Sequence, residues 1–162
     1  MSRLIFMMVV ALALCGCVTT PGTGPDSSSA SAAREASALA TERQWLQSWF
    51  SGTPVRITQR SDAAVGIDIP REFCFDPGHS HVKPALAAVL DKVAESLRRV
   101  PQVRLQLIAA PADSPLVTPL ALRRATQIRA HLVKRGVPAG QLGSPEGAPA
   151  ETVQLRMELV SS

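Results

Sequence analysis

Two kinds of apolar spacing alternate along this 162-residue chain, and they restrict the folds open to it. Between Pro84 and Pro101, the large apolar residues from Leu86 to Val100 recur every three or four positions, which is the spacing of one buried helix face. In segment 65–69, apolar residues stand at every second position, which is the spacing of a strand with one buried face. Because each such element has one apolar face to bury, the pattern predicts helices packed on a sheet.

The remaining elements follow from the same spacings. Strands are predicted at 55–57, 65–69, 103–108 and 153–159. In the third of these, Val103, Leu105 and Leu107 are expected on the buried side. A second helix begins after Thr118 and ends at Gly136, a favourable residue just beyond a helix end. The predicted fold class is therefore α/β (α+β), a two-layer sandwich in which helices cover one face of a mixed sheet.

Residues 1–16 resemble the signal peptide of a bacterial lipoprotein. The apolar run 4–14 would rise only about 16 Å as a helix, short of the roughly 30 Å hydrocarbon core, so it is not expected to span a membrane. The run ends in LCGC, and lipoprotein signals place an apolar residue, a small residue and the lipidated Cys in that arrangement. The resemblance implies cleavage before Cys17, acylation of its thiol and, because Val18 follows, sorting to the outer membrane. An ordinary cleaved signal with an unanchored product is the alternative.

Three further segments follow the signal peptide. Residues 17–33 are rich in Thr, Pro, Gly, Ser and Ala without apolar periodicity, which predicts a flexible tether. Residues 34–53 are predicted to form an amphipathic helix, and residues 54–162 a packed domain. The helical stripe comprises Leu39, Arg43, Leu46, Trp49 and Phe50, with Trp45 one position away. These aromatic side chains either pack on the domain or face a bilayer or a partner.

Charge and aromatic content argue against a nucleic-acid partner. The 17 Lys and Arg residues exceed the 13 Asp and Glu residues, but the cations never run longer than two in a row. Aromatic residues make up 4% of the chain, and Tyr is absent, so there is little surface on which bases could stack. We therefore expect no nucleic-acid binding.

The candidates for metal binding and catalysis are weak. Cys74, Asp76, His79 and His81 carry metal-ligating groups within one short segment. A His-x-His in a loop rich in Gly and Pro is more often solvated, so no metal site is predicted. Ser80 lacks the Gly-x-Ser-x-Gly turn of a nucleophile, and the chain has no phosphate-binding or dinucleotide glycine motif. We expect no catalytic residues, no enzymatic activity and no cofactor.

Four short motifs occur in a characteristic order: FCFD at 73–76 with Lys83-Pro84 after it, LALRRA at 120–125, GVP at 136–138, and RMEL at 156–159. In this order they resemble the OmpA-like C-terminal domain, a family that binds peptidoglycan in Gram-negative envelopes. The resemblance covers roughly residues 62–160. It implies a βαβαβ fold with a mixed sheet and helices on one face.

The resemblance also implies a ligand site. In the family, an Asp after the second strand and the Arg of the helix motif hold the ammonium and carboxylates of meso-diaminopimelate in the peptidoglycan stem peptide; Asp113 and Arg124 are the matching positions. A zwitterionic ligand needs such an anion and such a planar cation. The family's Gly-His-Thr before the Asp is 110–112 (APA) here, and its Asn before the helix is Val117, so weaker binding is expected. A purely structural ion pair is the alternative.

These features together predict an outer-membrane lipoprotein whose periplasmic domain binds peptidoglycan non-covalently and tethers the outer membrane to the cell wall. Its partners would be the diaminopimelate stem peptide and, through acylated Cys17, the lipid of the outer membrane. The alternative is a structural or assembly lipoprotein of a secretion or efflux complex, which contacts other envelope proteins and does not bind peptidoglycan.

Overall fold

A computed structural model describes residues 27–114, 118–149 and 151–160. The elements are α1 (Ser27–Trp49), β1 (Arg56–Ser61), β2 (Ala64–Pro70), the short helix η1 (Arg71–Phe73), α2 (Pro84–Arg99), β3 (Val103–Pro111), α3 (Pro119–Lys134), η2 (Ala139–Gln141), β4 (Pro145–Ala148) and β5 (Thr152–Leu159). The predicted signal peptide, Cys17, most of the predicted tether and Val117 lie outside the described residues.

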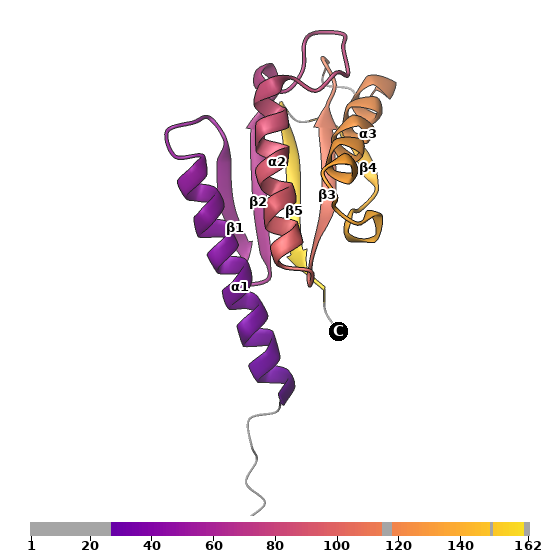
Figure 1. Ribbon diagram of the computed structural model, residues 1–162. Helices are drawn as coiled ribbons and strands as arrows, with labels where there is room; N and C mark the ends of the chain where they lie inside the picture. Colours follow the sequence, from indigo (N-terminus) through magenta and orange to yellow (C-terminus); the bar gives the residue numbers. More distant parts are fainter. Residues whose placement is uncertain (1–26, 115–117, 150, 161–162) are drawn as a thin grey trace, which may run out of the picture.

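The sheet has the strand order β1-β2-β5-β3-β4. Strands β3 and β4 pair in parallel, and all other neighbours are antiparallel. The helices α1, α2 and α3 cover one face of this sheet (Figure 1), which confirms the predicted two-layer α+β class with a mixed sheet. Strand β4 was not predicted, because Pro145 and Gly147 leave it without apolar alternation.

A bulge in β3 corrects one predicted side-chain direction. The β3–β5 register shifts between Leu105 and Leu107, and the strand changes parity there. Ile108 is consequently buried, while Leu107 is only half-buried and lines a hollow on the uncovered face of the sheet. The expectation that Leu107 points into the core was wrong.

Helix α1 begins at Ser27, which corrects the predicted boundary between tether and helix at 33/34. Once a packed segment of helix exists, each added residue costs little, and Ala has the highest helix propensity, so the Ser- and Ala-rich residues 27–33 extend it. The helix ends at Trp49, before a turn in which Gly52 has a φ of 74°. Its buried face is formed by Leu39, Glu42 and Leu46.

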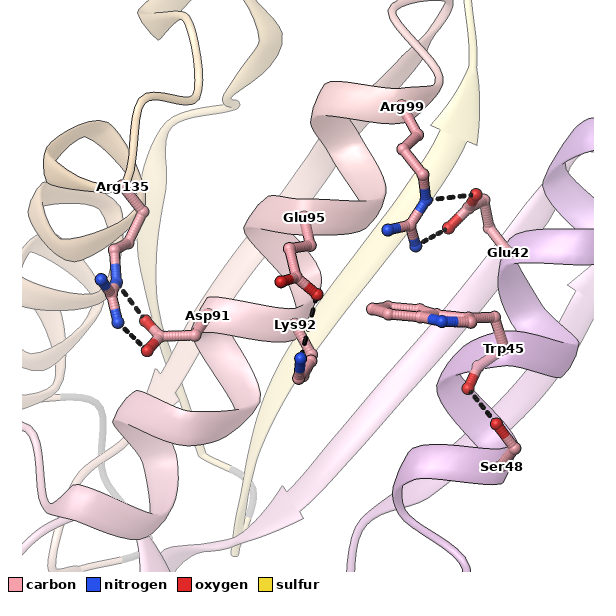
Figure 2. A network of polar contacts seen from close by, with 8 residues as sticks. All are labelled: Glu42, Trp45, Ser48, Asp91, Lys92, Glu95, Arg99 and Arg135. Atoms are coloured by element: carbon pink, nitrogen blue, oxygen red, sulfur yellow. Dashed lines mark hydrogen bonds and ion pairs between the residues drawn. The ribbon is translucent and has the colours of Figure 1, made fainter.

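Buried Glu42 links α1 to Arg99 of α2 (Figure 2). Its carboxylate accepts hydrogen bonds of 3.0 and 2.6 Å from Nε and Nη2 of Arg99, whose guanidinium lies 3.9 Å from the centre of the Trp45 ring. Trp45 and Phe50 pack against the core, as one of the two interpretations expected. Trp49 differs, because it is 53% exposed. Among the described residues, no helix combines the length and the apolar character needed to cross a membrane.

We predict that Glu42→Gln lowers the free energy of unfolding by about 1–2 kcal/mol, because the charge-assisted pair between buried Glu42 and exposed Arg99 is lost. Urea unfolding followed by circular dichroism measures this. Glu35→Gln, near the start of the same helix, is the matched control and should change stability by less than about 0.5 kcal/mol. Equal effects of the two substitutions would contradict the assigned role of Glu42.

Candidate ligand-binding site

The predicted site residues come together where three segments meet. Strand β3 ends at Pro111, and Asp113 follows it. The loop 74–83, between η1 and α2, lies at the same end of the molecule (Figure 1). Arg124 lies in α3 on the side that faces the sheet. As the sequence predicted, Asp113 and Arg124 converge: 2.7 Å separates Oδ1 of Asp113 from Nη2 of Arg124.

The guanidinium of Arg124 is completely buried, with 0% of the side chain exposed. Its Nε donates to the carbonyl oxygen of His79 at 2.8 Å, and its Nη1 donates to that of Pro111 at 2.9 Å. Nη2, which pairs with Asp113, also donates to the carbonyl oxygen of Asp76 at 3.1 Å. The fork of Arg124 is therefore occupied by the protein itself, and it joins α3 to the end of β3 and to the loop 74–83.

Asp113 has a different environment, because 34% of its side chain is exposed. Its Oδ2 accepts a hydrogen bond of 2.5 Å from the backbone N–H of Gly78. That amide, and then the Arg124 guanidinium, hold the pKa of Asp113 below its usual range. Gly78 has a φ of 72°, which favours glycine at this position of the loop. Asp113 thus presents an ionised, fixed and accessible carboxylate at neutral pH.

A cavity of about 310 Å³ opens beside Asp113. Its lining carries both signs of charge, and the residues that form it are Arg71, Glu72, Phe75, Asp76, Pro77, Lys83 and Asp113. The ammonium of Lys83 lies 3.2 Å from Oδ1 of Asp76 and donates to the carbonyl oxygen of Glu72 at 3.0 Å. Such a cavity can hold a small group that is itself both cationic and anionic.

Arg71 is a further residue of the site, and no motif in the sequence marks it as one. It lies in η1 directly after β2, and its place beside Asp113 depends on that turn, for which the sequence gives no spacing signal. Lys83, which also lines the cavity, belongs to the Lys83-Pro84 part of the family motif.

The candidate metal ligands of the loop do not assemble. Cys74 is buried, its thiol contacts the carbonyl oxygen of Pro70 at 3.2 Å, and burial raises its pKa to about 12. His79 contacts the carbonyl oxygen of Pro77 through Nδ1 at 2.8 Å. Across 27–114, 118–149 and 151–160, no three His, Cys, Asp or Glu side chains are grouped as metal ligands. That the protein binds no metal stays a prediction from the sequence.

Comparisons with solved structures establish the fold. A MotB-like protein from Desulfovibrio vulgaris matches with a TM-score of 0.64 at 12% identity, over 81% of this chain and 97% of that one. The periplasmic domain of Helicobacter pylori MotB matches with a TM-score of 0.56 at 18% identity, over 68% and 83%. The cell wall anchor of the type VI secretion system from Pseudomonas aeruginosa matches with a TM-score of 0.52 at 16% identity, over 78% and 98%. The predicted OmpA-like fold is confirmed. No protein-family model matches the sequence, and no curated protein sequence matches it significantly.

We predict that Asp113→Asn lowers the free energy of unfolding by about 1–3 kcal/mol at pH 7, because the buried Arg124 guanidinium loses its charged partner, while water screens the exposed side of Asp113. The lowered pKa of Asp113 contributes stability that is present above the unfolded pKa of about 4 and is lost as the pH falls through the folded value. The difference in the free energy of unfolding between wild type and Asp113→Asn, called the gap below, should therefore be constant from pH 7 to 5. It should narrow below about pH 4.

Urea unfolding at a series of pH values measures this gap. Asp62→Asn, in the exposed turn between β1 and β2, is the control and should show no comparable gap. A gap that stays constant down to pH 2 would contradict the pairing described for Asp113.

Proposed function

We propose that this protein binds peptidoglycan non-covalently, with the ionised carboxylate of Asp113 accepting the ammonium of a diaminopimelate residue in the stem peptide. The observation that carries the proposal is the exposed face of Asp113, which the Gly78 amide and Arg124 fix beside a cavity of mixed charge. A fixed carboxylate suits an ammonium, because little further ordering is needed on binding. The similarity in fold to a solved structure described as a cell wall anchor also supports the proposed binding of peptidoglycan.

Arg124 enters this proposal as a positioning residue. Its side chain is buried and donates to carbonyls of the loop and of β3, so it acts on the ligand through Asp113. A lysine has one charged nitrogen and cannot donate in all of these directions. Arg124→Lys should therefore impair binding nearly as much as Arg124→Ala.

We further propose that acylated Cys17 anchors the protein in the outer membrane. The arrangement of the domain supports this role, because the beginning of α1 and the loop 74–83 lie at opposite ends of the molecule (Figure 1). Helix α1 has 23 residues and is about 35 Å long. An anchor that precedes α1 would hold the site directed away from the membrane, toward the cell wall.

We predict that wild type sediments with insoluble peptidoglycan of the diaminopimelate type, and that Asp113→Ala binds at least about tenfold more weakly, because one charge-assisted hydrogen bond is lost. Asp62→Ala is the matched control and should sediment like wild type. If wild type binds and Asp113→Ala binds equally well, the site assignment is wrong. If folded wild type fails to sediment, the alternative role as an assembly protein of an envelope complex replaces this one.

For the anchor, we predict that Cys17→Ala accumulates as an unprocessed precursor that carries no acyl chain, whereas Cys15→Ala is processed normally. Labelling with a radioactive fatty acid, followed by membrane fractionation, measures both outcomes. Normal processing and outer-membrane retention of the Cys17 variant would contradict the proposal.

A further inference from the structure

Arg71 lies beside Asp113 with its guanidinium held in place. Nη1 of Arg71 donates to the carbonyl oxygen of Ala112, the residue before Asp113, at 2.9 Å. Arg71 and Asp113 line the same cavity, and 31% of the Arg71 side chain is exposed. Arg71 thus differs from Arg124, because part of its charged side chain remains accessible to a ligand.

The other terminal nitrogen of this guanidinium, Nη2, already holds a carboxylate. Nη2 of Arg71 lies 3.3 Å from Oε2 of Glu151, and the Glu151 side chain is 77% exposed. The backbone N–H of Arg71 also donates to the carbonyl oxygen of Glu151 at 3.1 Å. The two residues therefore remain neighbours even when the carboxylate of Glu151 leaves the guanidinium of Arg71. An ion pair this exposed contributes little to stability, and a carboxylate from a ligand can take the place of Glu151.

Lys83 is less suited to a ligand carboxylate, although it lines the same cavity. Its ammonium is engaged with the carboxylate of Asp76 and with the carbonyl of Glu72, much as Arg71 is engaged with Glu151 and Ala112. The difference between the two cations therefore lies in the geometry of the charged group. An arginine fork can also bind both oxygens of a carboxylate, which an ammonium does not do in the same fixed geometry.

The chemistry of the stem peptide matches the pair Asp113 and Arg71. Diaminopimelate differs from lysine by one carboxylate, which is attached to the carbon that bears the terminal amine. An ammonium and a carboxylate on one carbon need an anion and a cation side by side. We propose, on the basis of the proposed peptidoglycan binding, that Arg71 binds the side-chain carboxylate of diaminopimelate in place of Glu151 and so selects diaminopimelate-type over lysine-type stem peptides.

Two soluble probes that differ only in this carboxylate test the inference: N-acetylmuramyl-L-Ala-D-Glu-meso-diaminopimelate and the same peptide with L-Lys. Each is titrated calorimetrically into the detergent-solubilised full chain. We expect wild type to bind the diaminopimelate peptide about tenfold or more tightly than the lysine peptide. Arg71→Ala should reduce this ratio of affinities to about twofold or less, because it weakens the binding of the diaminopimelate peptide and leaves that of the lysine peptide unchanged.

Glu151→Gln should strengthen binding of the diaminopimelate peptide severalfold, because the competing carboxylate is removed. Arg60→Ala is the control, since Arg60 is paired with Asp68 at the same distance of 3.3 Å but on the uncovered face of the sheet, and it should leave both affinities unchanged. Retained affinity of Arg71→Ala for the lysine peptide shows that the site is intact.

The inference is overturned if Arg71→Ala keeps the tenfold preference, or if it loses both peptides equally. If wild type binds both peptides equally tightly, the inference about Arg71 is overturned but the proposed peptidoglycan binding stands, because Asp113 then acts without Arg71. Folded wild type that binds neither peptide overturns the proposed function, and this inference with it.

Discussion

The buried guanidinium of Arg124 is the interaction on which the arrangement of the site depends. A charge inside a protein is costly unless it is paired and its hydrogen-bonding groups are used. Here the compensation comes from Asp113 and from carbonyl oxygens of the loop 74–83 and of β3. These acceptors lie in several directions around one planar group, so α3, the loop and the strand end are held in one relative position. The residues beside Arg124 on the buried side of α3 are Ala121 and Ala125, which leave it room.

That burial divides the charges of the site into two groups. Arg124 is buried behind the cavity, where it fixes the position of Asp113 and helps to keep its carboxylate ionised. Asp113 lines the cavity together with two cations, Arg71 and Lys83, and two further carboxylates, Glu72 and Asp76. A surface that carries fixed charges of both signs favours a zwitterionic partner over a simple cation or anion, because each wrong charge meets a repulsive neighbour. The loop 74–83 beside the site and the beginning of α1 lie at opposite ends of the domain (Figure 1), as the proposed anchoring function requires.

Much of the fold could be predicted from the sequence, because local rules and tertiary structure agree there. Pro84 and Gly136 mark the boundaries of α2 and α3, and period-two spacing located β2 and β5. What could not be predicted depends on partners distant in sequence. The bulge after Leu105 is defined by its pairing with β5, and β4 is defined by its parallel pairing with the edge of β3. The convergence of Asp113 and Arg124 followed from a family motif, but the burial of Arg124 did not. Its acceptors are mostly backbone carbonyls, which every residue type possesses, so no residue pattern indicates them.

Nuclear magnetic resonance can test whether Asp113 and Arg71 contact the ligand while Arg124 stays buried. The backbone amides and the arginine Nε–H groups are followed during titration with the diaminopimelate tripeptide. We expect the resonances of the Gly78 amide, which donates to Asp113, and of the Nε–H of Arg71 to shift with the added peptide. The Nε–H of Arg124 should keep its hydrogen bond to His79 and stay protected from solvent exchange throughout. Shifts confined to residues of the uncovered sheet face, such as Gly66 and Arg60, or rapid exchange of the Arg124 Nε–H in the free protein, would contradict it.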